Sequence, residues 1–450
     1  MSAPSCRCQC KRCRASDADH CRSSPTCRAP RTIPTTPAAR LLYERLVAEA
    51  LGRLKASSGT HSPSVAELER ALPGAVRIDA CSLSNPYATD AVMPRLRAIT
   101  PARLERMVSH HPSQGAVIAS VLAPSVGVPA DQLVVANGAC EVIAALLARA
   151  SGSLLVSLPT FSAYYEFASG PVVTHHLDPA HEFRLDFGEL EALVERHAPE
   201  TVVVINPNNP DGGLAAHENL VRFVERMRGR VRQVIVDESF GAFSSPHEPA
   251  TLAPLIGELP HLVVVNSLSK SHGIAGLRLG YAVATPPRAR QLRGASLWNL
   301  NALAEWFCEL LADNSYRREY ESARRRYIRE TRRMFAGLAA LPGTRAYPSA
   351  ANFALLELDC PAADVATALL VRHGVYVRDC ADKRGLDGDR YLRVAARSEP
   401  DNDRVLDALT NVLTNRPANP SATTAEARAP LVAWRWPPPT PPCTRNSTPH

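Results

Sequence analysis

Five apolar runs rich in β-branched residues constrain the fold of this chain more than any other feature. Each places three to five apolar residues in succession and then turns polar, in DQLVVANG, SLLVSLP, TVVVINPNNP, RQVIVDESF and HLVVVNSLSK. A strand with one face in water alternates polar and apolar residues, whereas an unbroken apolar run suits a strand that is covered on both faces. The runs therefore predict the strands of a mostly parallel sheet.

Amphipathic segments separate these runs. ENLVRFVERMRGR and FGELEALVERHA carry apolar residues at helical spacing. The alternation predicts an α/β fold in which the polar strand ends share one edge of the sheet, where open α/β sheets bind ligands. From about residue 300 a long helical pattern is followed by two further strand patterns, ANFALLELD and RYLRVAAR, which predict a second, smaller α+β domain.

The two ends differ in composition from the rest. We expect a disordered Cys/Arg-rich segment at 1–34, an N-terminal arm with part of the small domain at 35–105, the large domain at 106–300, the C-terminal small domain at 301–415 and a disordered Pro-rich tail at 416–450. Half of the twelve cysteines lie in the first segment, but their CxCxC spacing lacks the paired CxxC of a zinc site, so no metal is predicted.

The positive charge of the chain is also concentrated at its ends. The formal net charge is +7, of which residues 1–31 carry +5 and residues 416–450 carry +3, leaving −1 for the body. A near-neutral body does not indicate a nucleic-acid partner. No stretch of about 18 apolar residues predicts a membrane span. The cysteines of the body are scattered, as is typical of free thiols, so we expect a cytoplasmic protein.

Polar groups gather at the predicted strand ends. Asn209 lies in NPNNPDGG, Asp237 in VIVDESF, and Ser267 and Lys270 in NSLSK, with Arg278 eight residues further on. A lysine, a carboxylate, an amide and an arginine are each costly to bury alone. Together they predict a cofactor site in which the lysine amine acts as a nucleophile.

Four motifs in a fixed order carry a family resemblance: NPNNPDGG, VDESF, SLSKSHGIAGLRLGYAVA and YLRVAARSE. With them the chain, over roughly residues 75–415, resembles fold-type I pyridoxal-phosphate enzymes of the class I/II aminotransferase family. In its motifs it is most similar to histidinol-phosphate aminotransferase and threonine-phosphate decarboxylase. The resemblance implies a mostly parallel central sheet in a large domain, a smaller α+β domain, and pyridoxal 5'-phosphate as cofactor.

The resemblance also implies roles for residues around the cofactor ring. Lys270 matches the lysine that binds the cofactor covalently and later moves a proton at the substrate Cα. Asp237 would pair with the pyridine nitrogen and keep it protonated. Asn209 matches the amide that hydrogen-bonds the ring hydroxyl, and Phe161 in LPTFSAYY matches the aromatic residue stacked on the ring.

Other residues match the groups that hold anions in the family. For the cofactor phosphate these are Ser267, Ser269, Arg278 and the backbone amides of Ala139 and Cys140 at a helix N-terminus. Arg393 in YLRVAAR corresponds to the arginine that binds the substrate α-carboxylate, for which a guanidinium fork is well suited. Arg378 in YVRDC matches a position that binds the distal phosphate of phosphorylated substrates.

Two positions depart from the family pattern. Phe240 stands where the relatives usually have a tyrosine whose hydroxyl helps Asn209 hold the ring oxygen, and His111 stands where they have a tyrosine that reaches the phosphate of the partner subunit. Taken singly, each of the predicted site residues would more often be a helix cap, a core residue or a solvated charge. Their joint occurrence in the family's order favours the site.

The resemblance implies an aminotransferase that moves an amino group between an amino acid and a 2-oxo acid, in a homodimer. An Arg393 fork that keeps the carboxylate near the ring plane would leave the Cα–H bond facing Lys270, which favours transamination. One alternative is a decarboxylase of the threonine-phosphate decarboxylase type. Another is a regulator, because LLYERLVAEALGRL and SGTHSPSVAELERAL faintly resemble half of a winged helix, although the next segment, PGAVRIDACSLSNPYATD, holds no recognition helix.

Overall fold

All five predicted runs form strands, and they lie in one seven-stranded sheet. The computed structural model describes residues 37–415 except 60, 248–249 and 295–298, so the predicted terminal segments lie outside the described residues. The strand order is β2 (Leu133–Ala136), β8 (Gly280–Val283), β7 (Leu262–Asn266), β6 (Gln233–Asp237), β5 (Thr201–Ile205), β3 (Leu154–Leu158) and β4 (Val172–His176). From β7 to β4 all neighbours are parallel, and only β8 runs antiparallel to its neighbours β2 and β7. The predicted α/β fold is confirmed.

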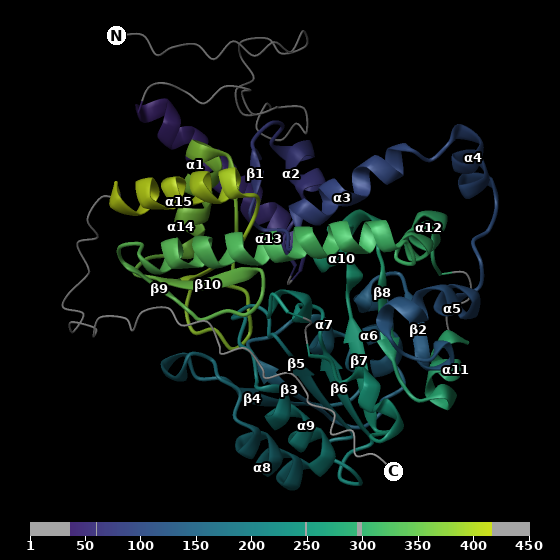
Figure 1. Cartoon of the computed structure of the whole chain (residues 1–450). Helices are drawn as coiled ribbons and strands as arrows, with labels where there is room; N and C mark the ends of the chain where they lie inside the picture. The colour runs from purple at the N-terminus through teal and green to yellow at the C-terminus, as the bar shows by residue number, and fades with distance from the viewer. Residues whose placement is uncertain (1–36, 60, 248–249, 295–298, 416–450) are drawn as a thin grey trace, which may run out of the picture.

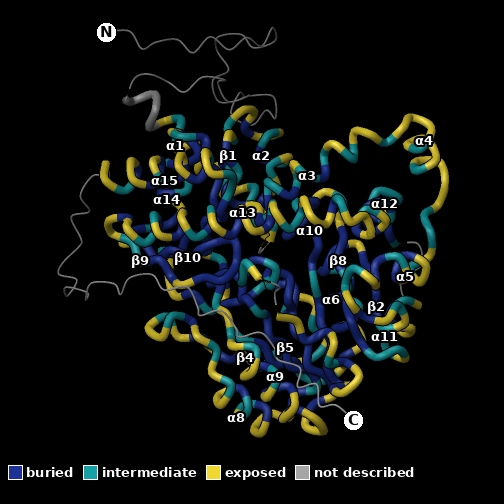
Figure 2. The backbone as a smooth tube through the Cα atoms, in the orientation of Figure 1, coloured by how far each residue is buried: buried dark blue, intermediate teal, exposed yellow. Residues whose placement is uncertain are grey.

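The apolar runs are unbroken because both faces of this sheet are covered. Val202 and Val204 of β5 pack into one core, whereas Val203 and Ile205 of the same strand pack into another on the opposite face. The first core is shared with α5 (Gly115–Val126), α8 (Phe187–His197) and α9 (His217–Arg226), and the second with α6 (Ala139–Leu147) and α11 (Pro286–Arg293). Figure 2 shows the strands as the most deeply buried part of the chain.

A second, smaller sheet lies beside the seven-stranded sheet. Its four strands are antiparallel, in the order β12 (Arg378–Asp379), β13 (Tyr391–Ala395), β10 (Phe353–Leu358) and β9 (Thr344–Ala346). Its core is shared with α13 (Asn314–Ala339), α14 (Ala362–Ala368) and α15 (Glu399–Thr414), and Figure 1 shows α13 as a long helix that crosses the molecule from the side of β9 and β10 to α12. The other helices are α3 (Pro86–Arg97), α4 (Pro101–Ser109), α7 (Ala163–Glu166), α10 (Leu268–Ser271) and α12 (Ala302–Leu310).

The N-terminal helices pack onto the small-sheet region. Val47 of α1 (Pro37–Ser57) and Leu68 of α2 (Val65–Ala71) share a core with Leu370 and Tyr376, and β1 (Ile78–Asp79) pairs in parallel with β11 (Val375–Tyr376). The two helices are therefore part of the body of the molecule. No helix of the described residues is long and apolar enough to span a membrane.

Candidate active site

The predicted site residues surround one pocket of about 460 Å³ between the two sheets. Its wall includes ten of the eleven predicted residues: Ala139, Cys140, Phe161, Asn209, Asp237, Ser267, Lys270, Arg278, Arg378 and Arg393. A larger hollow of about 750 Å³ between β4, α8 and α9 contains none of them. Ser269 is the one left out of the lining. Its buried hydroxyl donates to the Leu279 carbonyl oxygen at 3.1 Å and accepts from the Leu279 N–H at 3.3 Å.

Lys270 lies in α10, directly after the carboxyl end of β7. Burial, followed by the positive charges of Arg393 and Arg278, lowers the pKa of its amine to about 8. At pH 7 roughly a tenth of this amine is then unprotonated, which is far more than for an ordinary surface lysine. The geometry thus suits the predicted nucleophile.

Asp237 ends β6 and is held by two donors. The Tyr164 hydroxyl donates to its Oδ2 at 2.8 Å, and the Ser239 backbone N–H donates to its Oδ1 at 2.9 Å. Burial raises the pKa of this carboxyl, while the hydrogen bonds from Ser239 and Tyr164 oppose that rise. Tyr164 was not among the residues predicted from the sequence. Its only signal was its place near Phe161, in the short helix α7 (Ala163–Glu166) that follows.

The N-terminus of α6 forms a cradle for an anion. Gly138 precedes the helix with φ of 84°, and a Cβ there would lie 2.6 Å from a guanidinium nitrogen of Arg278. A Cβ on Gly280 of β8 would lie 2.5 Å from the Ala139 nitrogen, so both glycines are needed for the close approach. Exposed N–H groups at a helix N-terminus, beside an arginine, fit the phosphate of the expected cofactor.

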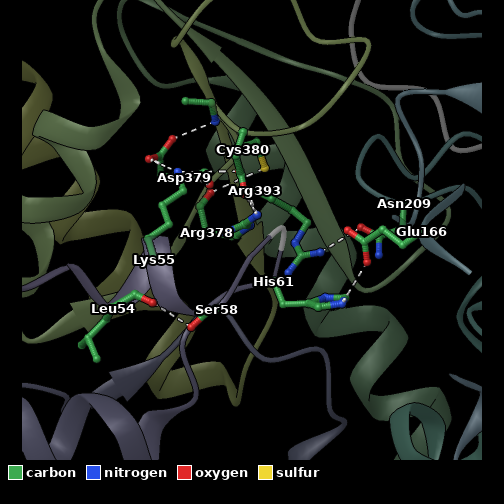
Figure 3. A network of polar contacts seen from close by, with 12 residues as sticks. Leu54, Lys55, Ser58, His61, Glu166, Asn209, Arg378, Asp379, Cys380 and Arg393 are labelled. Atoms are coloured by element: carbon green, nitrogen blue, oxygen red, sulfur yellow. Dashed lines mark hydrogen bonds and ion pairs between the residues drawn. The ribbon is translucent and has the colours of Figure 1, made fainter. Parts of the chain in front are cut away.

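Arg393 and Asn209 join the two halves of the pocket, as Figure 3 shows. Arg393 of β13 donates to the Asn209 side-chain oxygen at 2.8 Å and to the Cys81 carbonyl oxygen at 3.1 Å. Its buried Nε has no hydrogen-bond partner within the described part of the chain. A buried guanidinium with an unused donor is suited to an anionic ligand.

The end of the pocket around Arg378, away from Lys270 and Asp237, is called the distal end. It contains two basic residues that were not predicted from the sequence, Lys383 and His61. Lys383 is only 6% exposed, and burial, followed by the charge of Arg378, lowers its pKa to about 8. Burial also lowers the pKa of His61, which lies 3.8 Å from Glu166. Arg378 contacts both oxygens of Asp382, at 2.8 and 2.7 Å. This end therefore combines two buried cationic side chains, Arg378 and Lys383, with the carboxylate of Asp382.

The N-terminal segment holds this distal end in place. Lys55 of α1 contacts Asp379 at 2.6 Å and Asp382 at 3.6 Å, and His61 faces Glu166 across the opening (Figure 3). Residues 61–64 line the pocket directly. The segment that faintly resembles half of a winged helix therefore forms a wall of the site.

The two departures from the family pattern occupy different environments. Phe240 lines the pocket, and its ring packs edge-on against Phe353 with the centroids 5.0 Å apart. A phenyl ring offers no donor to a cofactor oxygen, so the predicted hydrogen bond from Asn209 would lack that hydroxyl as a second donor. His111 is exposed and lies outside the pocket lining.

Comparison with known proteins agrees with this geometry. The family model for aminotransferase class I and II matches residues 110–409. An L-serine phosphate decarboxylase of Campylobacter jejuni is 35% identical over 82% of this chain and 97% of its own, and that of Sulfurospirillum multivorans is 36% identical over 81% and 96%. The solved structure of a decarboxylase from Sulfurospirillum multivorans superposes with a TM-score of 0.77, at 35% identity over 82% of this chain and 97% of that one.

The expectation of transamination is wrong, because these relatives, which match over most of the chain, are decarboxylases. The expectation depended on Arg393 as the group that fixes the substrate carboxylate near the ring plane. In the structure Arg393 already donates to Asn209 and Cys81, and Arg378 and Lys383 line the same pocket. Arg393 alone therefore does not decide where the carboxylate lies.

Proposed function

Since this chain belongs to the class I and II aminotransferase family and its cofactor is pyridoxal 5'-phosphate, we propose that it is a decarboxylase of a phosphorylated amino acid, with L-serine phosphate as the first candidate. One observation carries the proposal. The pocket that contains Lys270 and Asp237 also gathers three cationic side chains at its other end, Arg378, Lys383 and Arg393.

Charge matching favours a substrate with two anionic groups. The cofactor phosphate would occupy the cradle at Arg278, which leaves Lys383 and Arg393, with Arg378 beside Asp382, to face the substrate. A phosphorylated amino acid brings a carboxylate and a phosphate dianion. An amino acid without the phosphate would bring no second anion to the buried Lys383, and a site built for a polar group strongly rejects ligands that lack it.

The position of the phosphate also bears on which bond breaks. In this class of reaction the cleaved bond is the one perpendicular to the cofactor ring. If Arg378, Lys383 and Arg393 hold the distal phosphate, the carboxylate is free to turn out of the ring plane. The bond from Cα to the carboxylate carbon is then aligned for cleavage.

The residues of the chain have separate tasks in this reaction. When bound, pyridoxal phosphate accepts the electron pair that remains at Cα after carbon dioxide leaves. Lys270 would hold the cofactor and then donate a proton to Cα in place of the lost carboxylate. Asp237 would supply a negative charge to the ring nitrogen, and Phe161 would cover a face of the ring. With L-serine phosphate the products are carbon dioxide and the phosphate ester of ethanolamine.

We also propose that the active protein is a homodimer, as expected from the resemblance. Helix α4 has no buried residue, and Figure 1 shows it lying away from the body of the molecule. Its Leu104 and Val108 are 49% and 82% exposed, and Val117 of α5 is 53% exposed. Apolar side chains in this position suit contact with a second copy. Light scattering on the purified protein measures its mass in solution.

The function is tested by product analysis. We expect the cofactor-loaded protein to release carbon dioxide and an amine in equal amounts from L-serine phosphate, and to be at least tenfold slower with L-serine. L-threonine phosphate in a parallel assay defines the tolerance for a methyl group. Formation of a 2-oxo acid without carbon dioxide contradicts the proposal.

A further inference from the structure

A buried tyrosine supports the carboxylate at the centre of the site. Tyr164 is fully buried, and its ring packs in the core between the large sheet and α6. Its hydroxyl donates to Asp237 Oδ2 at 2.8 Å. Burial and the nearby Asp237 charge raise the pKa of this phenol well above its ordinary value, so the hydroxyl keeps its proton and remains a donor.

The hydrogen bond fixes both the orientation and the charge of the carboxylate. With Oδ1 engaged by the Ser239 N–H and Oδ2 by Tyr164, rotation of the carboxylate would break both bonds. Burial on its own favours the protonated acid, and donated hydrogen bonds favour the ionised form. A ring nitrogen that must stay protonated needs the ionised form.

We infer that Tyr164 is a positioning residue, which holds Asp237 ionised and aimed at the pyridine nitrogen of the cofactor. The inference rests on the cofactor and not on the proposed substrate. Tyr164 touches neither cofactor nor substrate in this arrangement, since it does not line the pocket. Its effect therefore passes through Asp237.

The protein contains a matched control elsewhere. Tyr347 is also fully buried, and its hydroxyl donates to Glu357 Oε2 at the same distance of 2.8 Å. That pair lies in the small-sheet region and lines no part of the pocket. Tyr347→Phe thus removes the same kind of hydrogen bond without disturbing the site.

The test compares Tyr164→Phe with Tyr347→Phe as cofactor-loaded proteins, beginning with a readout that needs no substrate. The visible absorbance of the bound cofactor is titrated with pH. For Tyr164→Phe we expect the midpoint to move to higher pH by about half a unit to one unit. The positive charge on the ring promotes proton loss from the nitrogen that joins Lys270 to the cofactor, and a weaker charge promotes it less. Tyr347→Phe is expected to keep the wild-type midpoint. An unchanged midpoint in Tyr164→Phe, or an equal shift in both variants, overturns the inference.

Turnover gives the second readout. In Tyr164→Phe we expect kcat to fall about tenfold to a hundredfold, as for loss of a group that orients a functional residue, while KM stays within about threefold. A rise in KM with unchanged kcat contradicts a role at the ring nitrogen. If the protein lacks activity on every amino acid tried, the absorbance titration still decides the inference, so its failure is distinguishable from failure of the proposed function.

A double substitution tests whether Tyr164 acts through Asp237. Tyr164→Phe/Asp237→Asn removes both partners, so no buried charge is left unpaired and the protein is expected to fold even where Tyr164→Phe alone does not. We expect its absorbance titration and kcat to match those of Asp237→Asn alone, because the tyrosine then has nothing to orient. A further loss of about tenfold or more in the double variant shows a separate action and overturns the inference.

Discussion

The cofactor end and the distal end of the pocket are built in opposite ways. At the cofactor end the central carboxylate is already held, because Asp237 accepts from the Tyr164 hydroxyl and the Ser239 N–H. At the distal end Arg378 is paired with Asp382, whereas the buried Lys383 makes no side-chain hydrogen bond or ion pair with another side chain of the described residues. We conclude that the first end is fixed before any ligand arrives, whereas the second is completed by the substrate.

This comparison predicts that changes at the cofactor end lower kcat and changes at the distal end raise KM. Lys270→Ala gives the largest expected effect. The rate of decarboxylation should fall about a hundredfold to ten-thousandfold, because the variant lacks both the nucleophile and a positioned proton donor. Carbon dioxide release is the measurement, and an unchanged melting temperature serves as the control for folding. Residual activity above a tenth of the wild type would remove Lys270 from its predicted role.

Lys383→Met is the matching change at the distal end. We expect KM for L-serine phosphate to rise about tenfold to a hundredfold, the effect of losing one charged hydrogen bond, with kcat and the cofactor absorbance nearly unchanged. Steady-state kinetics measures the effect, and Lys383→Arg, which keeps the charge, is the control. A fall in kcat without a change in KM would show that the two ends are not separate in function.

The pH dependence of binding sharpens the same comparison. Lys383 has a pKa of about 8. Its amine is therefore positively charged below that pH, and the charge is lost as the pH rises through 8. We expect KM for L-serine phosphate to increase above about pH 8 in the wild type and to stay flatter in Lys383→Arg, whose guanidinium remains charged. Identical KM profiles for the two proteins would assign the pH dependence to another group.

Lys55→Met is expected to have the smallest effect. It removes the contacts to Asp379 and Asp382 that anchor the distal loop, and Lys55 is 27% exposed. Such a pair stabilises a fold by about 1 kcal/mol or less, so we expect a small fall in melting temperature and a rise in KM of about twofold to threefold. A thermal melt and one kinetic series suffice, and an effect as large as that of Lys383→Met would mean that α1 determines the distal end.

The two ends also differ in how far the sequence predicts them. The cofactor end follows from strand ends, because neighbouring parallel strands must bring Asn209, Asp237 and Lys270 to one edge of the sheet. Only Tyr164 was missed there, since a tyrosine in an apolar setting is usually a core residue. Ser269 was grouped with the site by motif, yet its hydroxyl faces the Leu279 backbone.

The distal end has no such local signal. Lys383 is buried in the irregular segment DKRGLDG, in which Gly385, with φ of 85°, lies close to Leu158 and Pro159 from a distant part of the chain. His61 reaches the pocket only because α1 and α2 pack on the small-sheet region. In the proposed function this end bears on the choice between transamination and decarboxylation. Because no local signal marks it, the sequence predicted the cofactor but not the reaction for which the similar proteins are named.

The clustered cations at the distal end also link folding to the ligand. Arg378, Lys383 and Arg393 repel one another in a confined space, and any anion that binds there favours the native state over the unfolded one. At a free concentration one hundred times its Kd, such an anion adds about 2.7 kcal/mol to the free energy of unfolding. The protein is therefore expected to resist heat and proteolysis better in phosphate buffer than in a buffer without a small anion, so its lifetime depends on the supply of the chemical group that it recognises.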